Sequence, residues 1–348
     1  MLKQVFVALS GGIDSAIAAY LLKKQGYDVI GITMDSGYKT DSLEQAKIVA
    51  GQLNIPHYVF DFRKQFKVEV IDNFCQQYLR GFTPNPCVRC NQFMKFGLLM
   101  QKALENGAYF ATGHYARIAY VREKKHYLIK KASDSSKDQS YVLYMLSQKQ
   151  LACLLLPLGE MKKEDVIFLA RELKLRCSKN KESQDICFVL DNNYVKFISQ
   201  MHPNFALKPG KTINSNGDII GEHKGFLAYT VGQRKGLGIA SKLPLFVLNI
   251  DAQNNTLLVG TQEQLYSQVF EMRDVFFSDP VYYNQAEFFA AVGVRYHHQP
   301  AKARVRKLVG DDIWQVTFNQ PQKAITNGQA AVFYKDEFVL GGGMIVNH

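Results

Sequence analysis

The sequence predicts an α/β protein in which an N-terminal domain with a parallel sheet is followed by a small mostly-β central domain and a C-terminal β-barrel. In the first half, short apolar runs alternate with helical patterns, which is typical of right-handed βαβ units. From about His202 to the end, short β-rich runs are separated by Gly, Asn and Pro. With 348 residues, two to three domains are expected. We place them at residues 1–194, 195–266 and 267–348.

Each element of the N-terminal half follows from its local pattern. Continuous β-rich runs predict buried strands, and apolar residues at helical spacing predict the helices between them. Because ligands of parallel sheets bind beyond the carboxyl ends of the strands, the loops there are candidate sites. The expected strands cover residues 5–9, 27–34, 57–62 and 108–118, and the expected helices cover 16–24, 43–53, 64–80, 93–106, 139–146 and 162–173.

The C-terminal half contains signals for hairpins. The segments NSNGD and DAQNNT are typical hairpin turns, so strands are expected on either side of each. A further strand is expected in FLAYTVGQRKGLGI, residues 226–239. From about Glu271, three β-rich stretches with steady turn spacing predict a small barrel or sandwich, of which we expect the barrel.

The composition limits the classes of function. There are 42 Lys and Arg against 31 Asp and Glu, a formal net charge of +11 that favours a polyanionic partner. Most of this excess lies before residue 195. The longest apolar run, 151–158, is far too short to span a membrane, and the N-terminus lacks a signal-peptide layout. We therefore expect a cytoplasmic protein without a membrane partner, whose six cysteines are buried thiols, metal ligands or catalytic groups.

The strongest motif is SGGIDS, residues 10–15, directly between the first strand and the first helix. Its two glycines permit a tight turn, and the helix N-terminus adds partial positive charge, so the loop is a candidate pyrophosphate cradle. It contains neither the lysine of the Walker loop nor a GxGxxG pattern. The alternative is a plain Gly-Gly turn in which Asp14 caps the helix.

This motif resembles that of the PP-loop ATP pyrophosphatase superfamily, whose members adenylate a carbonyl oxygen and release pyrophosphate. Further strings occur in an order similar to the tRNA-specific 2-thiouridylases of the MnmA family, and together they cover essentially the whole chain. The resemblance implies a Rossmann-like PP-loop domain at the N-terminus. The strings are TPNPCVRCNQFMKFG, ATGHYAR, KDQSYVLY, SQDICF, YTVGQRKGLGI, VGVRYHHQPAKARV and NGQAAVFY.

The resemblance implies an ATP-dependent sulfurtransferase that makes 2-thiouridine at the wobble position of tRNA, through an adenylated uracil and a cysteine persulfide. It implies ATP with Mg²⁺ as co-substrate and no permanently bound cofactor. The partners would be the anticodon arm of a tRNA with a wobble uridine, and a sulfur donor, either a cysteine desulfurase or a sulfur-relay protein.

Two cysteines match the catalytic positions of that family. Sulfur transfer needs a carrier, and a thiolate holds sulfane sulfur as a persulfide, which a second thiol resolves by forming a disulfide. By resemblance, Cys187 holds the persulfide and Cys90 is its partner. Cys75, Cys153 and Cys177 lie in apolar helical patterns and are expected to be structural thiols.

Cys87 keeps a second chemistry open. With Cys90 it forms C-x2-C, and Cys187 could supply a third ligand, so the alternative is a PP-loop tRNA thiolase that depends on an Fe–S cluster. Some thiouridylases have Asp at this position. Because this chain departs from that form, the carboxylate's acid–base role does not carry over.

The remaining family positions carry over residue by residue. Each of three positions has a structural alternative: Met34 could pack in the core, His114 could be a capped histidine in a loop, and residues 137–139 could cap a solvated helix start. The ATP-binding positions are Ala8, Leu9, Ser10, Gly11, Gly12, Ile13, Asp14, Ser15, Met34 and Gly113, and no metal ligand is assigned. The positions for the target base and tRNA are Asn85, Pro86, Cys87, His114, Lys137, Asp138, Gln139, Arg295, Tyr296 and Gln329.

Basic residues of the β region are weaker candidates for tRNA contact. Arg234 and Lys235 lie in a Gly-rich turn, and strand alternation would place Lys302, Arg304 and Arg306 on one face, where a solvated face is the alternative to phosphate contact. Two other functions stay open: a PP-loop ligase or amidotransferase with a small-molecule substrate, and an RNA-binding protein without catalysis.

Overall fold

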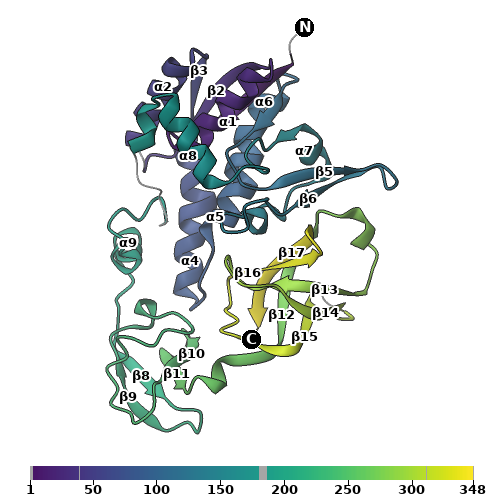
Figure 1. Cartoon of the computed structure of the whole chain (residues 1–348). Coiled ribbons are helices and arrows are strands. Elements are labelled where there is room, and N and C mark those ends of the chain that lie inside the picture. The colour runs from purple at the N-terminus through teal and green to yellow at the C-terminus, as the bar shows by residue number, and fades with distance from the viewer. Residues whose placement is uncertain (1–2, 39, 180–185, 311, 348) are drawn as a thin grey trace.

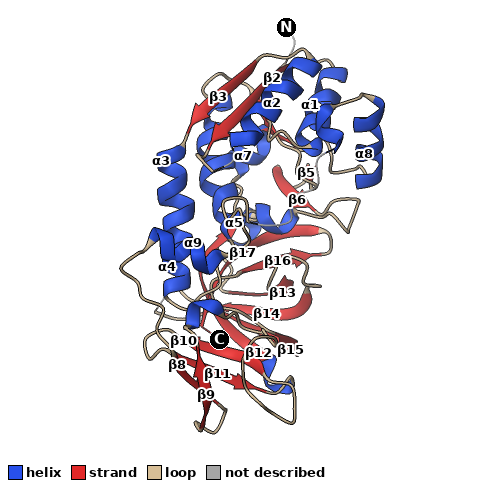
Figure 2. Cartoon of the chain, turned by 90° about the vertical axis from the view of Figure 1, so that its left-hand side faces the viewer, coloured by secondary structure: helices blue, strands red, loops and turns tan. Residues whose placement is uncertain are grey.

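The structure, a computed structural model, describes residues 3–38, 40–179, 186–310 and 312–347. An α/β domain occupies one end of the molecule, and two β domains lie side by side at the other (Figures 1 and 2). Within the described residues, no helix is both long and apolar enough to cross a membrane.

The N-terminal sheet is parallel throughout, as expected. Its strand order is β3-β2-β1-β4-β7. The order reverses between β1 and β4, and such a switch point opens a crevice at the carboxyl ends of the strands. The strands are β1 (Gln4–Ala8), β2 (Asp28–Asp35), β3 (His57–Asp61), β4 (Tyr109–Ala111) and β7 (Leu154–Leu155).

Both faces of this sheet are covered. Val5 and Val7 pack into one core with α1 (Ile13–Lys24), α2 (Thr40–Leu53) and α8 (Lys163–Glu172). Phe6 points to the opposite face and a second core. Alternate residues of β1 are thus buried on both sides, which explains why its sequence is continuously apolar.

The second face carries two long helical stretches. The first, expected over 64–80, runs as α3 (Arg63–Phe66), η1 (Lys67–Asp72) and α4 (Asn73–Leu79), with a π-helical middle. The second runs as α5 (Pro86–Arg89), η2 (Cys90–Leu99), also π-helical, and α6 (Met100–Leu104). It begins at Pro86 rather than at the expected Phe93, because Asn85 caps it and proline suits the first helical position.

The strand expected over 108–118 is wrong beyond Ala111. The chain leaves the parallel sheet there and forms a hairpin, β5 (Arg117–Val121) and β6 (His126–Lys130), that joins the barrel sheet through β17. The helix expected over 139–146 is only a 3₁₀ turn, η3 (Ser140–Leu143). It is followed by α7 (Gln148–Cys153), which starts with a capping box at Ser147.

The central domain is a four-stranded sheet of order β10-β11-β8-β9 that follows η4 (Arg176–Lys179) and α9 (Tyr194–Met201). Both expected hairpin turns are confirmed. The strand expected over 226–239 is wrong: a short η5 (Phe226–Ala228) leads into irregular chain, because Gly232, Gly236 and Gly238 adopt positive φ angles. The strands are β8 (Gly210–Ile213), β9 (Ile219–His223), β10 (Phe246–Asp251) and β11 (Thr256–Gly260).

The C-terminal barrel is confirmed. Its strands follow the order β12-β15-β14-β13-β16-β17, and the pairing of β12 with β17 closes the sheet. Added Cβ atoms at Gly342 and Gly343 would overlap the backbone of neighbouring strands, so the glycines permit closure. The elements are η6 (Glu263–Leu265), β12 (Tyr266–Phe277), η7 (Pro280–Tyr282), β13 (Glu287–Gly293), β14 (Ala301–Lys307), β15 (Trp314–Lys323), β16 (Ala330–Lys335) and β17 (Phe338–Asn347).

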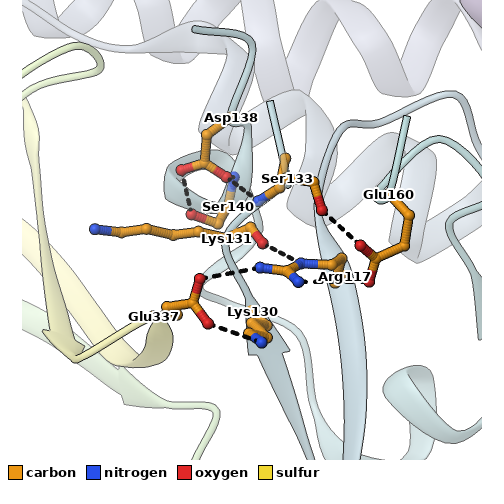
Figure 3. A network of polar contacts seen from close by, with 9 residues as sticks. Arg117, Lys130, Lys131, Ser133, Asp138, Ser140, Glu160 and Glu337 are labelled. Carbon is orange, nitrogen blue, oxygen red and sulfur yellow. Dashed lines mark hydrogen bonds and ion pairs between the residues drawn. The ribbon is translucent and has the colours of Figure 1, made fainter. Parts of the chain in front are cut away.

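A polar network fixes the barrel to the α/β domain (Figure 3). Glu337, at the turn between β16 and β17, pairs with Arg117 at 3.2 Å and Lys130 at 2.7 Å. Arg117 also donates to the Lys131 carbonyl at 2.6 Å and pairs with Glu160 at 3.4 Å. The β5–β6 hairpin is therefore one structural link between the two domains.

Candidate functional site

The SGGIDS loop lies between β1 and α1, as the sequence predicts. The Ser15 hydroxyl accepts from the Ser10 amide at 3.1 Å and donates to the Gly12 carbonyl at 3.1 Å, which closes the loop on itself. Gly11 has a φ of +75°, and a Cβ there would lie 2.7 Å from Gln45 Cβ. Helix α1 starts at Gly12 without a side-chain cap, so its first N–H groups are left for a ligand.

Asp14 does not cap the helix, so that alternative is wrong. It lies inside the first turn of α1, and its carboxylate accepts from the Tyr115 hydroxyl at 2.8 Å. Lys163 of α8 contacts both carboxylate oxygens, at 2.7 and 2.8 Å. Sequence reasoning missed Tyr115 and Lys163, because nothing in their local pattern distinguishes them from other residues.

Gly113 lies against the same loop. It follows β4, and a Cβ at this position would lie 2.7 Å from the backbone of Asp14 and Ser15. Met34, at the end of β2, is half-buried against the core, so its packing alternative holds whether or not it also contacts a nucleotide. The loop and Gly113 follow β1 and β4, and Met34 lies near the end of β2, so all three lie at one edge of the sheet.

His114 is a half-buried, neutral histidine. Its Nδ1 lies 2.8 Å from the Thr112 hydroxyl, and its ring lies 5.6 Å from that of Phe96. Burial, with a smaller contribution from Lys95, holds the pKa of His114 well below its usual range. The imidazole is therefore uncharged at neutral pH.

The C-x2-C segment begins a helix. The Asn85 side chain accepts from the amides of Cys87 and Val88 at 3.1 and 3.4 Å, and Pro86 takes the first helical position. One helical turn separates the exposed Cys87 from Cys90, which is buried. The helix that begins at Pro86 thus carries two thiols at different depths.

Cys90 and Cys187 are brought into electrostatic range of each other. Burial raises the pKa of Cys90 to about 12, Lys95 lowers it, and charge on Cys187 or Cys87 raises it further. Cys187 itself is exposed. Its neighbour Phe188 is buried and packs edge-on against Phe74 with ring centroids 5.1 Å apart, which fixes this part of the chain beside α4.

The cysteines do not form a ready metal site. All six lie within the described residues, and none is in a disulfide. Among the residues that the structure describes, no three His, Cys, Asp or Glu side chains gather closely enough to hold a metal ion. This arrangement disfavours a cluster on Cys87, Cys90 and Cys187. Cys75 and Cys177 are buried and Cys153 is half-buried, in line with structural roles.

Two of the predicted tRNA residues have structural partners inside the α/β domain. Asp138 accepts from the Ala132 amide at 2.9 Å and the Ser140 hydroxyl at 2.8 Å. The Gln139 side chain accepts from the Tyr115 amide at 3.0 Å. Gln139 therefore supports the loop that carries Gly113 and Tyr115, whereas Asp138 holds its own segment. The contact of both residues with tRNA stays a prediction, as does that of the neighbouring Lys137.

The barrel contacts the segment of the α/β domain that precedes the C-x2-C helix. Gln329 donates to the Thr83 carbonyl at 2.7 Å, and Thr83 donates its amide to the Asn327 carbonyl at 2.9 Å. The segment that leads to Asn85 is thus fixed by the barrel. Arg295, after β13, is exposed, and Tyr296 is half-buried with its ring 6.0 Å from that of Tyr141.

The basic face expected on β14 is confirmed. Lys302, Arg304 and Arg306 are exposed, and Ala303 and Val305 between them are buried in the barrel. Arg304 pairs with Glu287 of β13 at 2.6 Å. Strand alternation alone therefore leaves three cations on one side of the strand.

Three family models match the chain. They are described as a tRNA methyl transferase HUP domain at residues 3–191, a tRNA methyl transferase PRC-barrel domain at 196–261, and an aminomethyltransferase beta-barrel domain at 273–345. They agree with the α/β domain, the central domain and the closed barrel.

Curated relatives match over almost the full length. The chain is 46% identical to the tRNA-specific 2-thiouridylase MnmA 2 of Thermoanaerobacter sp. (strain X514), covering 98% of this chain and 97% of that protein. It is 42% identical to the tRNA-specific 2-thiouridylase MnmA of Clostridium beijerinckii, covering 99% of each. A solved 4-thiouridine synthetase–RNA complex with bound ATP is 16% identical over 58% of this chain and 51% of that chain, with a TM-score of 0.36, too low to support an argument.

Proposed function

The chain belongs to the tRNA-specific 2-thiouridylase family. From this membership we propose which residues carry out each of two half-reactions. The protein is a tRNA sulfurtransferase that uses ATP to place sulfur at C2 of a uridine. We propose that the target is the wobble uridine of the anticodon arm, that the intermediate is an adenylated uracil, and that the sulfur comes from a cysteine persulfide.

In the first half-reaction, the SGGIDS loop holds the phosphates of ATP. The O2 atom of the uracil attacks the α-phosphorus, the bond to the β-phosphate breaks, and pyrophosphate leaves. The step is needed because oxygen on C2 is a poor leaving group, whereas AMP leaves readily. The assigned nucleotide residues are Ala8, Leu9, Ser10, Gly11, Gly12, Ile13, Asp14, Ser15, Met34 and Gly113.

In the second half-reaction, the terminal sulfur of the Cys187 persulfide attacks C2 and AMP departs. The thiolate of Cys90 then attacks the Sγ atom of Cys187, and the electrons of the broken S–S bond pass to the sulfur on C2. The products are 2-thiouridine and a Cys90–Cys187 disulfide, which a dithiol reductant must reduce before the next turnover.

The observation that supports this order is the different exposure of the two thiols. Cys187 is exposed and can be reached by a protein sulfur donor, whereas Cys90 is buried beside it and its pKa is raised to about 12. A protonated, buried thiol is a poor acceptor of sulfur from outside. The donor, a cysteine desulfurase or a sulfur-relay protein, would therefore load Cys187.

Mg²⁺ is proposed to arrive with ATP. Oxygen donors suit this ion, and the loop offers Asp14 and the hydroxyls of Ser10 and Ser15. Because Lys163 already neutralises Asp14, we assign the ion to the phosphates rather than to a permanent protein site. When bound, it offsets phosphate charge. We propose no permanently bound cofactor.

The tRNA is proposed to dock across the α/β domain and the β domains. The boundaries at residues 194 and 266 lie close to the ends of the matched family models. The proposed location is the cytoplasm. The proposed target-base and tRNA residues are Asn85, Pro86, Cys87, His114, Lys137, Asp138, Gln139, Arg295, Tyr296 and Gln329.

A thiolation assay tests the proposal. Unmodified tRNA with a wobble uridine, Mg-ATP and a cysteine desulfurase with cysteine would be incubated with wild type, Cys90→Ser, Cys187→Ser and the control Cys153→Ser. Mass spectrometry of nucleosides should show 2-thiouridine with wild type and the control, and none with the other two variants. Full activity of Cys187→Ser would refute the persulfide role. Activity that requires iron loading would favour the Fe–S alternative.

A further inference from the structure

The phosphate loop contains no cation of its own. SGGIDS has an acidic residue, Asp14, where a triphosphate has to approach, and no lysine or arginine. The structure brings one from far along the chain: Lys163 Nζ lies 2.7 and 2.8 Å from the two Asp14 carboxylate oxygens. A cation therefore lies directly at the first turn of α1.

Lys163 is held in place from three sides. It is the first residue of α8, and its backbone amide donates to the Asp134 carboxylate at 3.0 Å. Helix α8 buries Val166 and Ala170 in the same core as α1. The Lys163 ammonium lies 5.6 Å from the centre of the Tyr115 ring, and the Tyr115 hydroxyl donates to Asp14 at 2.8 Å.

A purely structural role explains this arrangement poorly. The Lys163 side chain is only 11% exposed, and withdrawing an ion pair from water costs about as much as the pair returns, so apolar residues would serve packing as well. The pair lies instead where the uncapped N–H groups of α1 already favour an anion.

We propose that Lys163 supplies the phosphate-binding cation that the SGGIDS loop lacks, with Asp14 and Tyr115 as positioning residues. This role rests on the proposed use of ATP at the loop. As the bond between the α- and β-phosphates breaks, its electron pair and negative charge pass to pyrophosphate. The ammonium donates hydrogen bonds to that charge and transfers no proton.

The test compares four variants in ATP binding without tRNA and in tRNA-dependent release of pyrophosphate. Lys163→Met removes the cation and keeps length and apolar volume. Lys163→Arg keeps the charge. Tyr115→Phe removes one positioning hydrogen bond but leaves the cation. Lys162→Met, at the exposed neighbouring lysine, is the matched control for net charge.

Lys163→Met should weaken ATP binding about tenfold and slow pyrophosphate release about 100-fold, because a charge-assisted contact is lost and the loss is largest in the transition state. Lys163→Arg should recover part of both, Tyr115→Phe should have a smaller effect, and Lys162→Met should match wild type. Melting temperatures identify any variant that fails to fold.

Three results would overturn the inference. If folded Lys163→Met binds ATP and releases pyrophosphate like wild type, Lys163 is only a structural partner of Asp14. If Lys162→Met loses as much as Lys163→Met, general charge and not this contact is responsible. Wild type that neither binds ATP nor releases pyrophosphate would refute ATP use itself, and with it both proposals.

Discussion

The phosphate half and the sulfur half of the site are built in different ways. The phosphate half is a short loop whose polar groups bond to one another, with Ser10, Gly12 and Ser15 linked at 3.1 Å. The sulfur half assembles thiols from distant segments, one buried at Cys90 and one exposed at Cys187. Local sequence is sufficient for the loop itself, which Gly113 and Lys163 reach from other segments, whereas tertiary packing alone brings the two thiols together.

The difference fits the two tasks. A phosphate cradle works best when its N–H groups are fixed before the ligand arrives, because no reorganisation is then needed during the reaction. A sulfur carrier must first meet a donor protein and then the uracil, so its thiol has to be accessible. In the proposed reaction, the depth of Cys90 keeps the resolving thiol away from the donor.

Gly113→Ala should break the phosphate half alone and give the largest effect. The added Cβ would lie 2.7 Å from the backbone of Asp14 and Ser15, so the loop has to shift. A displacement of this size should slow pyrophosphate release by about 100-fold. Reaction of Cys187 with a thiol reagent should be unchanged. Gly51→Ala, in open space on α2, is the control, and equal loss in both would contradict the close-packing account.

The sulfur half should respond to pH where the phosphate half does not. Burial raises the pKa of Cys90 to about 12, so its thiolate is scarce at neutral pH. At pH values below this pKa, the thiolate fraction increases roughly tenfold each time the pH rises by one unit. Single-turnover sulfur transfer from preloaded Cys187 should therefore speed up about 100-fold between about pH 7 and about pH 9. A flat profile would show that ionisation of Cys90 does not limit transfer.

The β14 face should affect tRNA binding and neither half-reaction. Lys302→Ala and Arg306→Ala each remove one exposed cation. Each should weaken tRNA binding a few-fold and lower the slope of log Kd against log salt by about one. Lys24→Ala, an exposed lysine at the end of α1, is the control. Unchanged salt slopes in both β14 variants would mean that this face is merely solvated.

Glu337→Gln should have the smallest effect, because Glu337 contacts neither the SGGIDS loop nor the cysteines and only helps to join the two domains. It removes the pairs with Arg117 and Lys130, but the Glu337 side chain is 56% exposed (Figure 3). We expect at most a small loss in unfolding free energy by denaturant titration, because exposed ion pairs contribute little to stability. A larger loss, with Lys149→Gln on the exposed side of α7 unchanged, would show that the network dominates domain docking.

The comparison also explains what the sequence predicts well. Hydrophobic periodicity and turn residues predict the parallel sheet, the barrel and the strand–loop–helix setting of SGGIDS, because each of these signals is local in the sequence. The hairpin at Arg117 and the turn after Ala111 were missed, since the barrel and not the local pattern decides where β5 pairs. Lys163 was missed for the same reason: its role depends on α8 packing against α1.

The burial of Cys90 was also beyond local sequence, although resemblance identified the residue. NPCVRC gives no sign that one thiol is exposed and the other is covered, because the covering side chains come from other segments. Resemblance likewise assigned Gln139 to tRNA contact, which stays a prediction, and the structure adds that this side chain supports the backbone of Tyr115.

The central claim is that the exposed thiol receives sulfur and the buried one does not. The most direct test is peptide mass spectrometry of wild type after brief incubation with a cysteine desulfurase and cysteine, before ATP or tRNA is added. We predict one additional sulfur atom on the peptide that contains Cys187 and none on the peptide that contains Cys90. Sulfur found first on Cys90, with Cys187 unmodified, would contradict the account.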